Sequence, residues 1–304
     1  MYQYDAPSNT PPTQVFDAPA FNAIYGVDFS GARLAGRHAW LARIERDARD
    51  DAPAPYKLTR LARLDTLCGV PEREPVLAHL VSQIAASHNA LWALGFPFGL
   101  PLEVQPEAAK GGWLAQVGFL REWGEDAYGA GVECLRRAQA LGHKGHIRRL
   151  TDMETQAPWD TYSYRIIYQT FYGMRDVLGP LWATEGTAIL PFDYTRLAQS
   201  ARVLVEACPS STLRRLGLPH TGYKRAGTGP LEPPHRRARR EILAGLAPHV
   251  SVGRVRRRLA MLDPAGDALD ALVAAVGAAL SWPETDHGRV AGHPRYVCEG
   301  RQYV

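Results

Sequence analysis

Residues 23–31 read A-I-Y-G-V-D-F-S-G, and this stretch decides the fold class. Apolar and β-branched residues lead up to Asp28, after which Ser30 and Gly31 supply a turn, so a buried strand is expected over residues 23–29. A carboxylate at the end of a buried strand is costly unless a hydrogen-bond partner or a cation satisfies it. Asp28 is therefore either a cap for the turn at Ser30 or a member of a functional site.

Strand and helix patterns continue outward from this segment. Strands are expected over residues 38–44 and 56–64, where they would form a meander with the first strand. A helical pattern over residues 76–87 and a short apolar strand over residues 90–94 come next. This order of strand, helix and strand implies a parallel crossover.

The residue pattern changes from strand-like to helical before the second half of the chain. Residues 110–182 carry aromatic-rich helical patterns, so a helical insertion is expected at about residues 102–200. Four elements are predicted to follow: a strand over residues 203–208, a basic helix over 234–246, an amphipathic helix over 267–280 and a terminal strand over 296–304.

These elements predict a single α/β domain over residues 21–304, with a mixed central sheet flanked by helices, after a Pro-rich flexible lead-in at residues 1–20. Hydrophobic residues make up 46% of the chain and charged residues 22%, which excludes disorder of the whole. No signal peptide or membrane span is expected, because no apolar run approaches eighteen residues. The four cysteines form no CxxC pair, which predicts neither a zinc knuckle nor a disulfide framework and fits a reducing cytoplasm.

Three further carboxylates lie at the ends of predicted elements, as Asp28 does. Glu206 ends the apolar strand V-L-V, which we expect to lie beside the first strand, so that both carboxylates face one cleft at the carboxyl ends of the strands. Asp267 and Asp270 share one face at the start of a helix. The alternatives are a Glu206 paired with an arginine and an Asp267 that only caps its helix.

Four converging carboxylates would repel one another unless a cation neutralised them. Hard oxygen ligands suit Mg²⁺ and Mn²⁺, so either ion is the expected cofactor of such a site. The predicted metal ligands are Asp28, Glu206, Asp267 and Asp270.

Five short motifs occur in a fixed order along the chain. They are Y-G-V-D-F-S-G-A at residues 25–32, L-G-F-P-F-G-L-P at 94–101, V-E-A-C-P-S-S at 205–211, G-Y-K at 222–224 and G-D-A-L-D-A-L at 266–272. As an ordered set they resemble the domain of unknown function 429 family, whose members are predicted nucleases of RNase H-like fold. The last motif also resembles the two-aspartate helix of RuvC-type resolvases.

The resemblance implies an RNase H-like fold and a metal-dependent nuclease in which Asp28, Glu206, Asp267 and Asp270 are catalytic. One departure concerns the second motif, where the family usually carries an aspartate and this chain has Gly95 and Phe96. The loss of this acid leaves the activity in question.

Candidate substrate-binding residues lie near the same motifs: Ser30, Arg148, Arg149, Tyr223 and Lys224. The two arginines would clamp phosphates, or else lie on the surface while Asp152 caps a helix. Lys224 would meet a phosphate, or else be a solvated lysine.

Basic clusters and an aromatic run complete the candidate set. The arginines at residues 236–240 and 254–258 would seat a nucleic-acid backbone, or else be solvated. An aromatic run over residues 159–172 is more typical of core packing than of base stacking.

The sequence is compatible with three functions. The leading hypothesis is a metal-dependent nuclease with nucleic acid as its partner. The second is a nucleic-acid-binding protein that has lost catalysis with the acid at Gly95, and the third is a small-phosphoester or nucleotide hydrolase. The oligomeric state and the choice between DNA and RNA are not specified.

Overall fold

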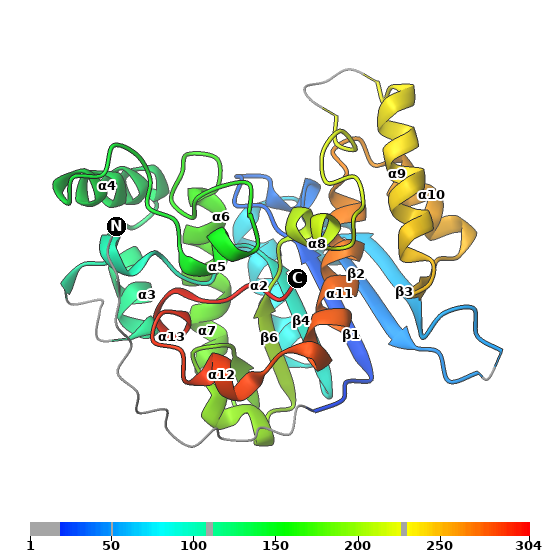
Figure 1. Ribbon diagram of the computed structural model, residues 1–304, viewed down its shortest axis with the longest axis horizontal. Helices are drawn as coiled ribbons and strands as arrows, with labels where there is room; N and C mark the ends of the chain where they lie inside the picture. Colours follow the sequence, from blue (N-terminus) through cyan, green and yellow to red (C-terminus); the bar gives the residue numbers. More distant parts are fainter. Residues whose placement is uncertain (1–18, 50, 108–111, 226–229) are drawn as a thin grey trace.

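A computed structural model describes residues 19–49, 51–107, 112–225 and 230–304 of this chain. Its centre is a seven-stranded sheet in the order β5-β6-β4-β1-β2-β3-β7, with helices on both faces (Figure 1). The strands are β1 Ala23–Asp28, β2 Trp40–Arg46, β3 Tyr56–Arg63, β4 Ala90–Gly95, β5 Thr187–Ile189, β6 Arg202–Glu206 and β7 Val250–Ser251.

Helices connect these strands and form the inserted region between β4 and β6. Before that region lie η1 Ala35–Arg37, α1 Leu64–Cys68 and α2 Arg73–Ala85. The region itself contains η2 Leu102–Val104, α3 Trp113–Glu122, α4 Ala127–Ala140, α5 Leu150–Glu154, α6 Ile167–Tyr172, the π-helical η4 Gly173–Leu178, α7 Gly179–Trp182 and η5 Tyr194–Gln199. After β6 come α8 Pro209–Arg215, α9 Pro233–Leu246, α10 Arg254–Leu262, α11 Asp267–Glu284, α12 His287–Ala291 and α13 Tyr296–Glu299.

The first strand holds the middle of the sheet. β1 pairs antiparallel with β2 and parallel with β4, and β2 continues antiparallel to β3, so the predicted meander is confirmed. The parallel strands β4, β6 and β5 extend the other half. The predicted α/β class with a mixed central sheet flanked by helices is therefore confirmed, and the arrangement is consistent with an RNase H-like fold.

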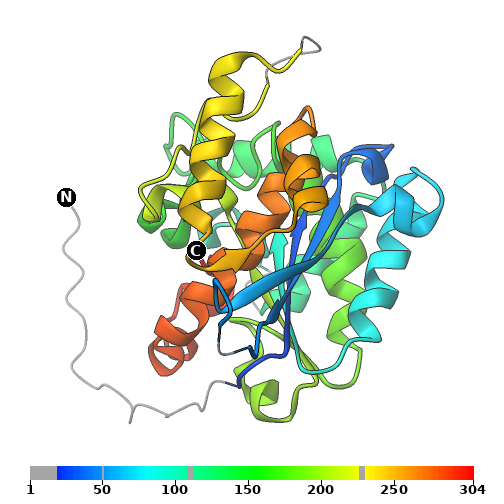
Figure 2. The ribbon, with the colours of Figure 1, turned by 90° about the vertical axis from the view of Figure 1, so that its right-hand side faces the viewer.

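Each face of the sheet is covered by a different helix layer. Figure 2 shows α11 on one side of the strands and α2 on the other. Alternation along β1 turns Ile24 and Gly26 toward α11, whereas Val27 joins the core around α2. Asp28 continues the first set, so its carboxylate lies on the α11 face.

Glycine at position 26 permits close contact between α11 and β1. A Cβ atom there would lie 2.1 Å from the carbonyl oxygen of Ala271 and 2.5 Å from the amide nitrogen of Ala275. Both atoms belong to the helix backbone and cannot rotate away. The contact places the first turn of α11 beside the end of β1.

Three sequence-based expectations about this sheet are corrected. The strand of Glu206 does not lie beside β1, because β4 intervenes and pairs with both. The predicted terminal strand over residues 296–304 is instead α13 followed by a single bridge between Gln302 and Glu206. The strands β5 and β7 were not expected, since segments of three and two residues carry too little pattern to be detected.

Two other expectations concern the ends of the chain and the membrane. The predicted flexible lead-in falls almost entirely on residues 1–18, which lie outside the described residues. Within the described ranges, no helix combines the length and apolar character needed to cross a membrane.

The contact at Gly26 generates a stability prediction. Gly26→Ala should destabilise the protein by about 1–3 kcal/mol or more, because the added methyl group overpacks two backbone segments. The matched control is Gly118→Ala in α3, where an added Cβ meets no atom within 4 Å. This variant should be more stable than the wild type by about 0.5–1 kcal/mol, because alanine lowers the entropy of the unfolded chain. Urea denaturation midpoints measure both. Equal stability of Gly26→Ala and the wild type would contradict the described packing.

Candidate functional site

A cleft of about 500 Å³ opens where β1, β4 and β6 end. Its floor includes Asp28, Gly95 and Glu206, the last residues of these three strands. Residues 157–169 of the inserted region supply one part of its wall, and residues 220–224, between α8 and α9, supply another. The carboxyl ends of parallel strands are the usual ligand site of open α/β sheets.

Three aspartates meet beside this cleft and are called the aspartate cluster below. Asp28 comes from β1, while Asp267 and Asp270 come from the first turn of α11. The ammonium group of Lys224 lies among them: its Nζ contacts Oδ2 of Asp270 and lies 3.9 Å from Oδ1 of Asp267. The Lys224 side chain as a whole is 44% exposed, so only its charged end is enclosed.

Charges within this group shift the pKa values of Asp28, Asp267 and Lys224. Burial raises the pKa of Asp28 well above its usual range; Lys224 opposes the rise and the other two aspartates add to it. Burial likewise raises the pKa of Asp267 to about 7, against the opposing charge of Lys224. Burial would lower the pKa of Lys224, but the three aspartates raise it above its ordinary value. One ammonium thus faces three carboxylates.

Neighbouring groups fix the orientation of Asp270. The buried Tyr223 donates its hydroxyl to Oδ1 of Asp270 at 2.7 Å. Arg239, also buried, donates to the carbonyl oxygen of Tyr223 at 2.8 Å and to that of Met261 at 3.1 Å. Arg239 therefore ties the Tyr223 loop to the segment before α11 and is unavailable to a nucleic-acid backbone, which corrects the prediction for this one arginine.

Glu206 lies on the other face of the sheet from the aspartate cluster. Val203 and Val205 join the core beneath α11, whereas Leu204 joins the core around α2, so Glu206 continues the α2 side. Its carboxylate accepts from the amide of Phe98 at 2.8 Å. Glu206 lines the same cleft as Asp28 and Asp270, as predicted, but its carboxylate is paired with Arg149 and not with the aspartate cluster.

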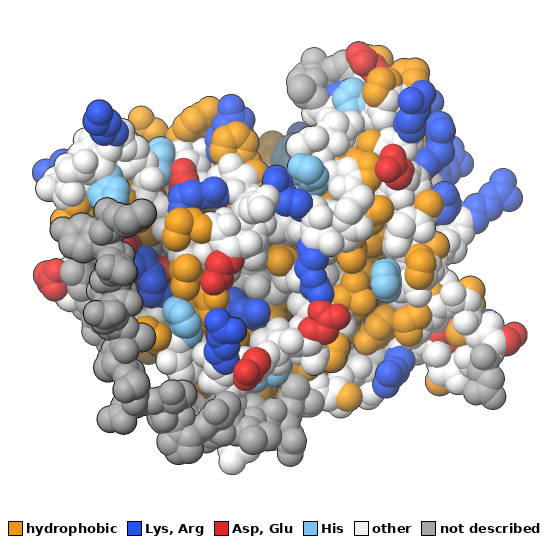
Figure 3. Space-filling model, in the orientation of Figure 1, with side chains coloured by type: hydrophobic (Ala, Val, Ile, Leu, Met, Phe, Trp, Pro, Cys, Tyr) orange, Lys and Arg blue, Asp and Glu red, His pale blue; other side chains and the backbone are white. Residues whose placement is uncertain are grey.

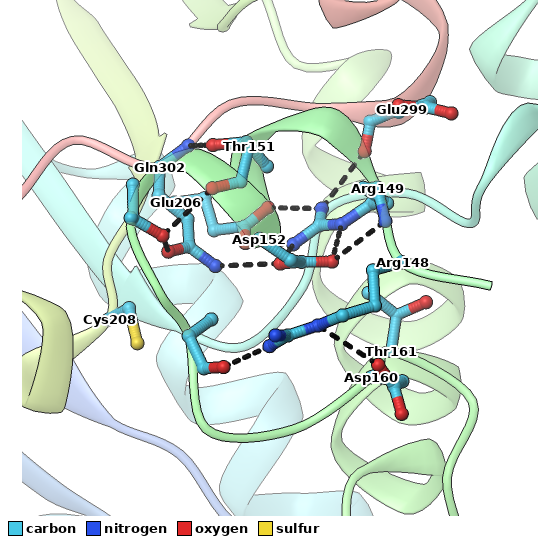
Figure 4. Close-up of polar contacts among 12 residues, drawn as sticks. Arg148, Arg149, Thr151, Asp152, Asp160, Thr161, Glu206, Cys208, Glu299 and Gln302 are labelled. Carbon is cyan, nitrogen blue, oxygen red and sulfur yellow. Dashed lines mark hydrogen bonds and ion pairs between the residues drawn. The ribbon is translucent and has the colours of Figure 1, made fainter. Parts of the chain in front are cut away.

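Arg149 holds the buried Glu206 carboxylate in an ion pair (Figure 4). Its Nη1 and Nη2 lie 2.8 Å and 2.5 Å from the two Glu206 oxygens. Its Nε and Nη2 also donate to Asp152 at 2.9 Å and 2.8 Å, and its Nη1 to the carbonyl oxygen of Glu299 at 2.9 Å. A guanidinium has five N–H donors, and these five contacts use all of them.

The contacts of Arg149 stabilise the fold and leave this arginine no free donor. Burial would lower the pKa of Arg149, but Asp152 and Glu206 raise it well above its usual range. Gln302 donates to Asp152 at 3.0 Å, which ties the chain after α13 to the same ion pair. As arranged, Arg149 has no donor for a phosphate, and the alternative of a Glu206 paired with an arginine describes the structure.

Of the remaining candidate substrate-binding residues, two line the cleft and two stabilise loops or turns near it. Tyr223 and Lys224 line the cleft. Ser30 accepts from the amide of Ala32 at 3.3 Å, as a turn cap does, and does not line the cleft. Arg148 lies 3.1 Å from Asp160 and donates to the carbonyl oxygen of Ala157, so it fixes the loop over residues 157–160.

The missing family acid has a packing explanation. Gly95 pairs in register with Asp28, and a Cβ on it would lie 2.8 Å from the carbonyl oxygen of Val27. Phe96 is buried against Phe29 and leaves room only for glycine at position 173. An acid at either position would disturb the core.

The donor chemistry of the aspartate cluster suits a divalent metal, although its present placement suits a lysine. Carboxylate oxygens with excess negative charge are the ligands that Mg²⁺ and Mn²⁺ prefer. Across the described part of the chain, however, no group of three or more His, Cys, Asp or Glu side chains is placed to hold a metal ion. The contact of the Lys224 ammonium with Asp270 is the charge pairing that the described structure shows in this cluster.

Basic side chains gather over α9 and α10, as Figure 3 shows. Arg236, Arg237 and Arg240 are exposed on α9, and Arg254, Arg257 and Arg258 are exposed on α10. Arg239 of the same α9 is buried and holds the Tyr223 loop, and none of these exposed arginines is among the residues that line the cleft.

The sequence analysis missed three contributors to the site. Asp263 accepts from the amide of Ala268 and adds to the charge on the cluster; the only signal was an acid shortly before a helix start. Trp159 and Arg165 line the cleft from the inserted region, where the aromatic run had been assigned to packing. The prediction holds for Tyr162 and Phe171, which are buried, but not for Trp159, which is exposed.

Comparison with known proteins gives one match. Residues 190–295 match the family model described as protein of unknown function (DUF429), a span that holds Glu206, Lys224 and both α11 aspartates but not Asp28. This match supports the family that the motifs indicated. Searches of curated proteins and of solved structures gave no match.

The raised pKa of Asp267 predicts a pH-dependent cost of folding. A carboxyl whose pKa rises from 3.8 to about 7 on folding stabilises the fold fully below pH 4 and loses this contribution as pH rises through 7. Asp267→Asn cannot ionise, so its stability relative to the wild type should increase between pH 4 and pH 8, by on the order of 2–4 kcal/mol. Urea denaturation in EDTA at both pH values measures the difference. A difference that stays constant with pH would show that Asp267 ionises normally.

Proposed function

We propose that this protein is a divalent-metal-dependent hydrolase of phosphodiester bonds in nucleic acid, with Asp28, Asp267 and Asp270 as its metal-binding residues. The observation that carries the proposal is the meeting of these three carboxylates on one face of the sheet, at the mouth of a cleft. Burial raises the pKa of Asp28 and Asp267, so a bound cation would favour their ionised forms.

A divalent metal bound there would lower the pKa of a water molecule and stabilise charge on a phosphate. The chain's own groups have separate tasks. Tyr223 keeps Asp270 oriented through its hydroxyl, and Lys224, once free of Asp270, is long enough to reach a phosphate in the cleft. Glu206 has no metal-binding task in this proposal, because Arg149 neutralises it.

The basic surface supports nucleic acid as the substrate. Exposed arginines cluster on α9 and α10, and such clusters attract phosphate backbones by counterion release. Localisation in the cytoplasm stays an expectation from cysteine usage.

A second candidate is binding without catalysis. It is favoured by the contact of Lys224 with Asp270, which occupies the cluster, and by Gly95 and Phe96, which exclude the family acid. The third reading, a small-phosphoester hydrolase, is compatible with the cleft volume of about 500 Å³, within the range of small-molecule pockets.

Metal binding is tested by thermal stability. Mg²⁺ or Mn²⁺ should raise the melting temperature of the wild type, since a ligand at a hundred times its Kd stabilises the folded state by about 2.7 kcal/mol. Lys224→Met removes the competing ammonium and should enlarge the shift, while Asp28→Asn should remove most of it. If all three proteins show the same shift, the metal binds elsewhere.

Catalysis is tested by cleavage of labelled single-stranded and duplex nucleic acid. Asp28→Asn should reduce metal-dependent cleavage by at least about a hundredfold, because one ligand charge is lost while the shape is kept. The matched control is Asp51→Asn, which changes an exposed aspartate and should cleave as the wild type does. Cleavage that survives Asp28→Asn would refute the assignment. Binding without any cleavage by the wild type would favour the second candidate.

A further inference from the structure

Exposed aromatic side chains concentrate in one segment of the inserted region, and one of them, Trp159, lines the cleft. The described residues include four large exposed aromatic side chains, and three of them lie within residues 159–168: Trp159, Tyr164 and Tyr168. The fourth, Tyr128, lies on α4. Large aromatic groups are normally buried, so exposure of several within ten residues indicates a contact surface.

Trp159 and Tyr164 share a cationic neighbour. The guanidinium carbon of Arg165 lies 4.6 Å from the ring centre of Trp159 and 5.2 Å from that of Tyr164. Arg165 is exposed, and no carboxylate of the described residues pairs with it. Trp159 and Arg165 both line the cleft, and Trp159 remains 46% exposed there.

The surface is held rigid by the segment that carries it. Arg148 donates to the carbonyl oxygen of Ala157 on one side of Trp159 and contacts Asp160 at 3.1 Å on the other (Figure 4). The amide of Ser163 donates to the carbonyl oxygen of Asp160 at 3.1 Å and closes the next turn. An aromatic group fixed in this way loses little conformational entropy when a ligand stacks on it.

We propose that Trp159, Tyr164 and Arg165 form a stacking site for the base of an unpaired nucleotide whose phosphate lies toward Lys224. This site rests on the proposed function in its choice of nucleic acid and narrows the substrate to single-stranded regions. Every base presents a flat π-face, and aromatic and guanidinium groups bind such faces without sequence preference. Paired bases in a duplex hide these faces, so a duplex gains nothing from the site.

Fluorescence anisotropy of a labelled single-stranded oligonucleotide tests the site. All proteins carry Asp28→Asn, so that cleavage does not interfere. Trp159→Ala should weaken binding roughly tenfold, the loss expected for one stacked base. Trp159→Phe keeps an aromatic face and should retain most of the affinity, whereas the control Tyr128→Ala removes an exposed aromatic group outside the cleft and should change nothing.

The same measurement separates the competing outcomes. Affinity for a duplex of the same sequence should not respond to Trp159→Ala. Displacement of the oligonucleotide by equimolar AMP would assign the site to free nucleotides, and displacement only by a large excess would assign it to a strand; both outcomes support stacking. Equal single-strand affinities of Trp159→Ala and Tyr128→Ala overturn the proposal. Single-strand binding through Trp159, combined with no metal-dependent cleavage by the protein that retains Asp28, overturns the proposed function and leaves the stacking site standing.

Discussion

The backbone of α11 lies against β1 with no space for a side chain between them. The carbonyl oxygen of Ala271 and the amide nitrogen of Ala275 occupy the region where any substituent of Gly26 would project. This contact sets the position of the longest described helix on the sheet and so brings Asp270 to Asp28, two residues that are 242 positions apart in the chain. The cleft, the charge of its aspartates and the placement of Lys224 all depend on it.

Buried acids on the two faces of the sheet are neutralised in different ways. On the α2 face, Arg149 satisfies Glu206 and Asp152 with four of the five N–H groups of its guanidinium, and this pairing also anchors the end of the chain through Gln302. Removal of one partner from such a buried ion pair strongly destabilises the fold, because the other charge would be left without compensation. On the α11 face, one exposed lysine serves three aspartates, so the charge there is only partly compensated. The first arrangement holds the fold together, whereas the second leaves buried carboxyl groups with raised pKa values.

The inserted region is also more than a cover for the sheet. It contributes Tyr162 and Phe171 to the core and turns Trp159 and Arg165 toward the cleft. Its loop is held by Arg148, a residue first considered for phosphate binding, whose contacts with Ala157 and Asp160 instead give the wall its shape. The lining of the cleft thus comes partly from the sheet and partly from this insertion.

The sequence by itself determined the longer central strands, the helix α11 and the positions of its aspartates. Alternation in A-I-Y-G-V-D predicted β1 with Asp28 at its end, and the apolar stripe of α11 predicted a helix that carries Asp267 and Asp270 on one face, because both patterns are local and repeat at the period of their element. Only the tertiary structure decided where Glu206 points. Its strand was predicted correctly, but β4 lies between it and β1, and the pairing of Leu94 with Glu206 turns the carboxylate to the opposite face. A shift of one residue in register exchanges the faces of a strand, and register is set by contacts between distant segments that no local pattern records. The same reason hid the partnership of Arg149 with Glu206 and the burial of Arg239 within a helix whose other arginines are exposed.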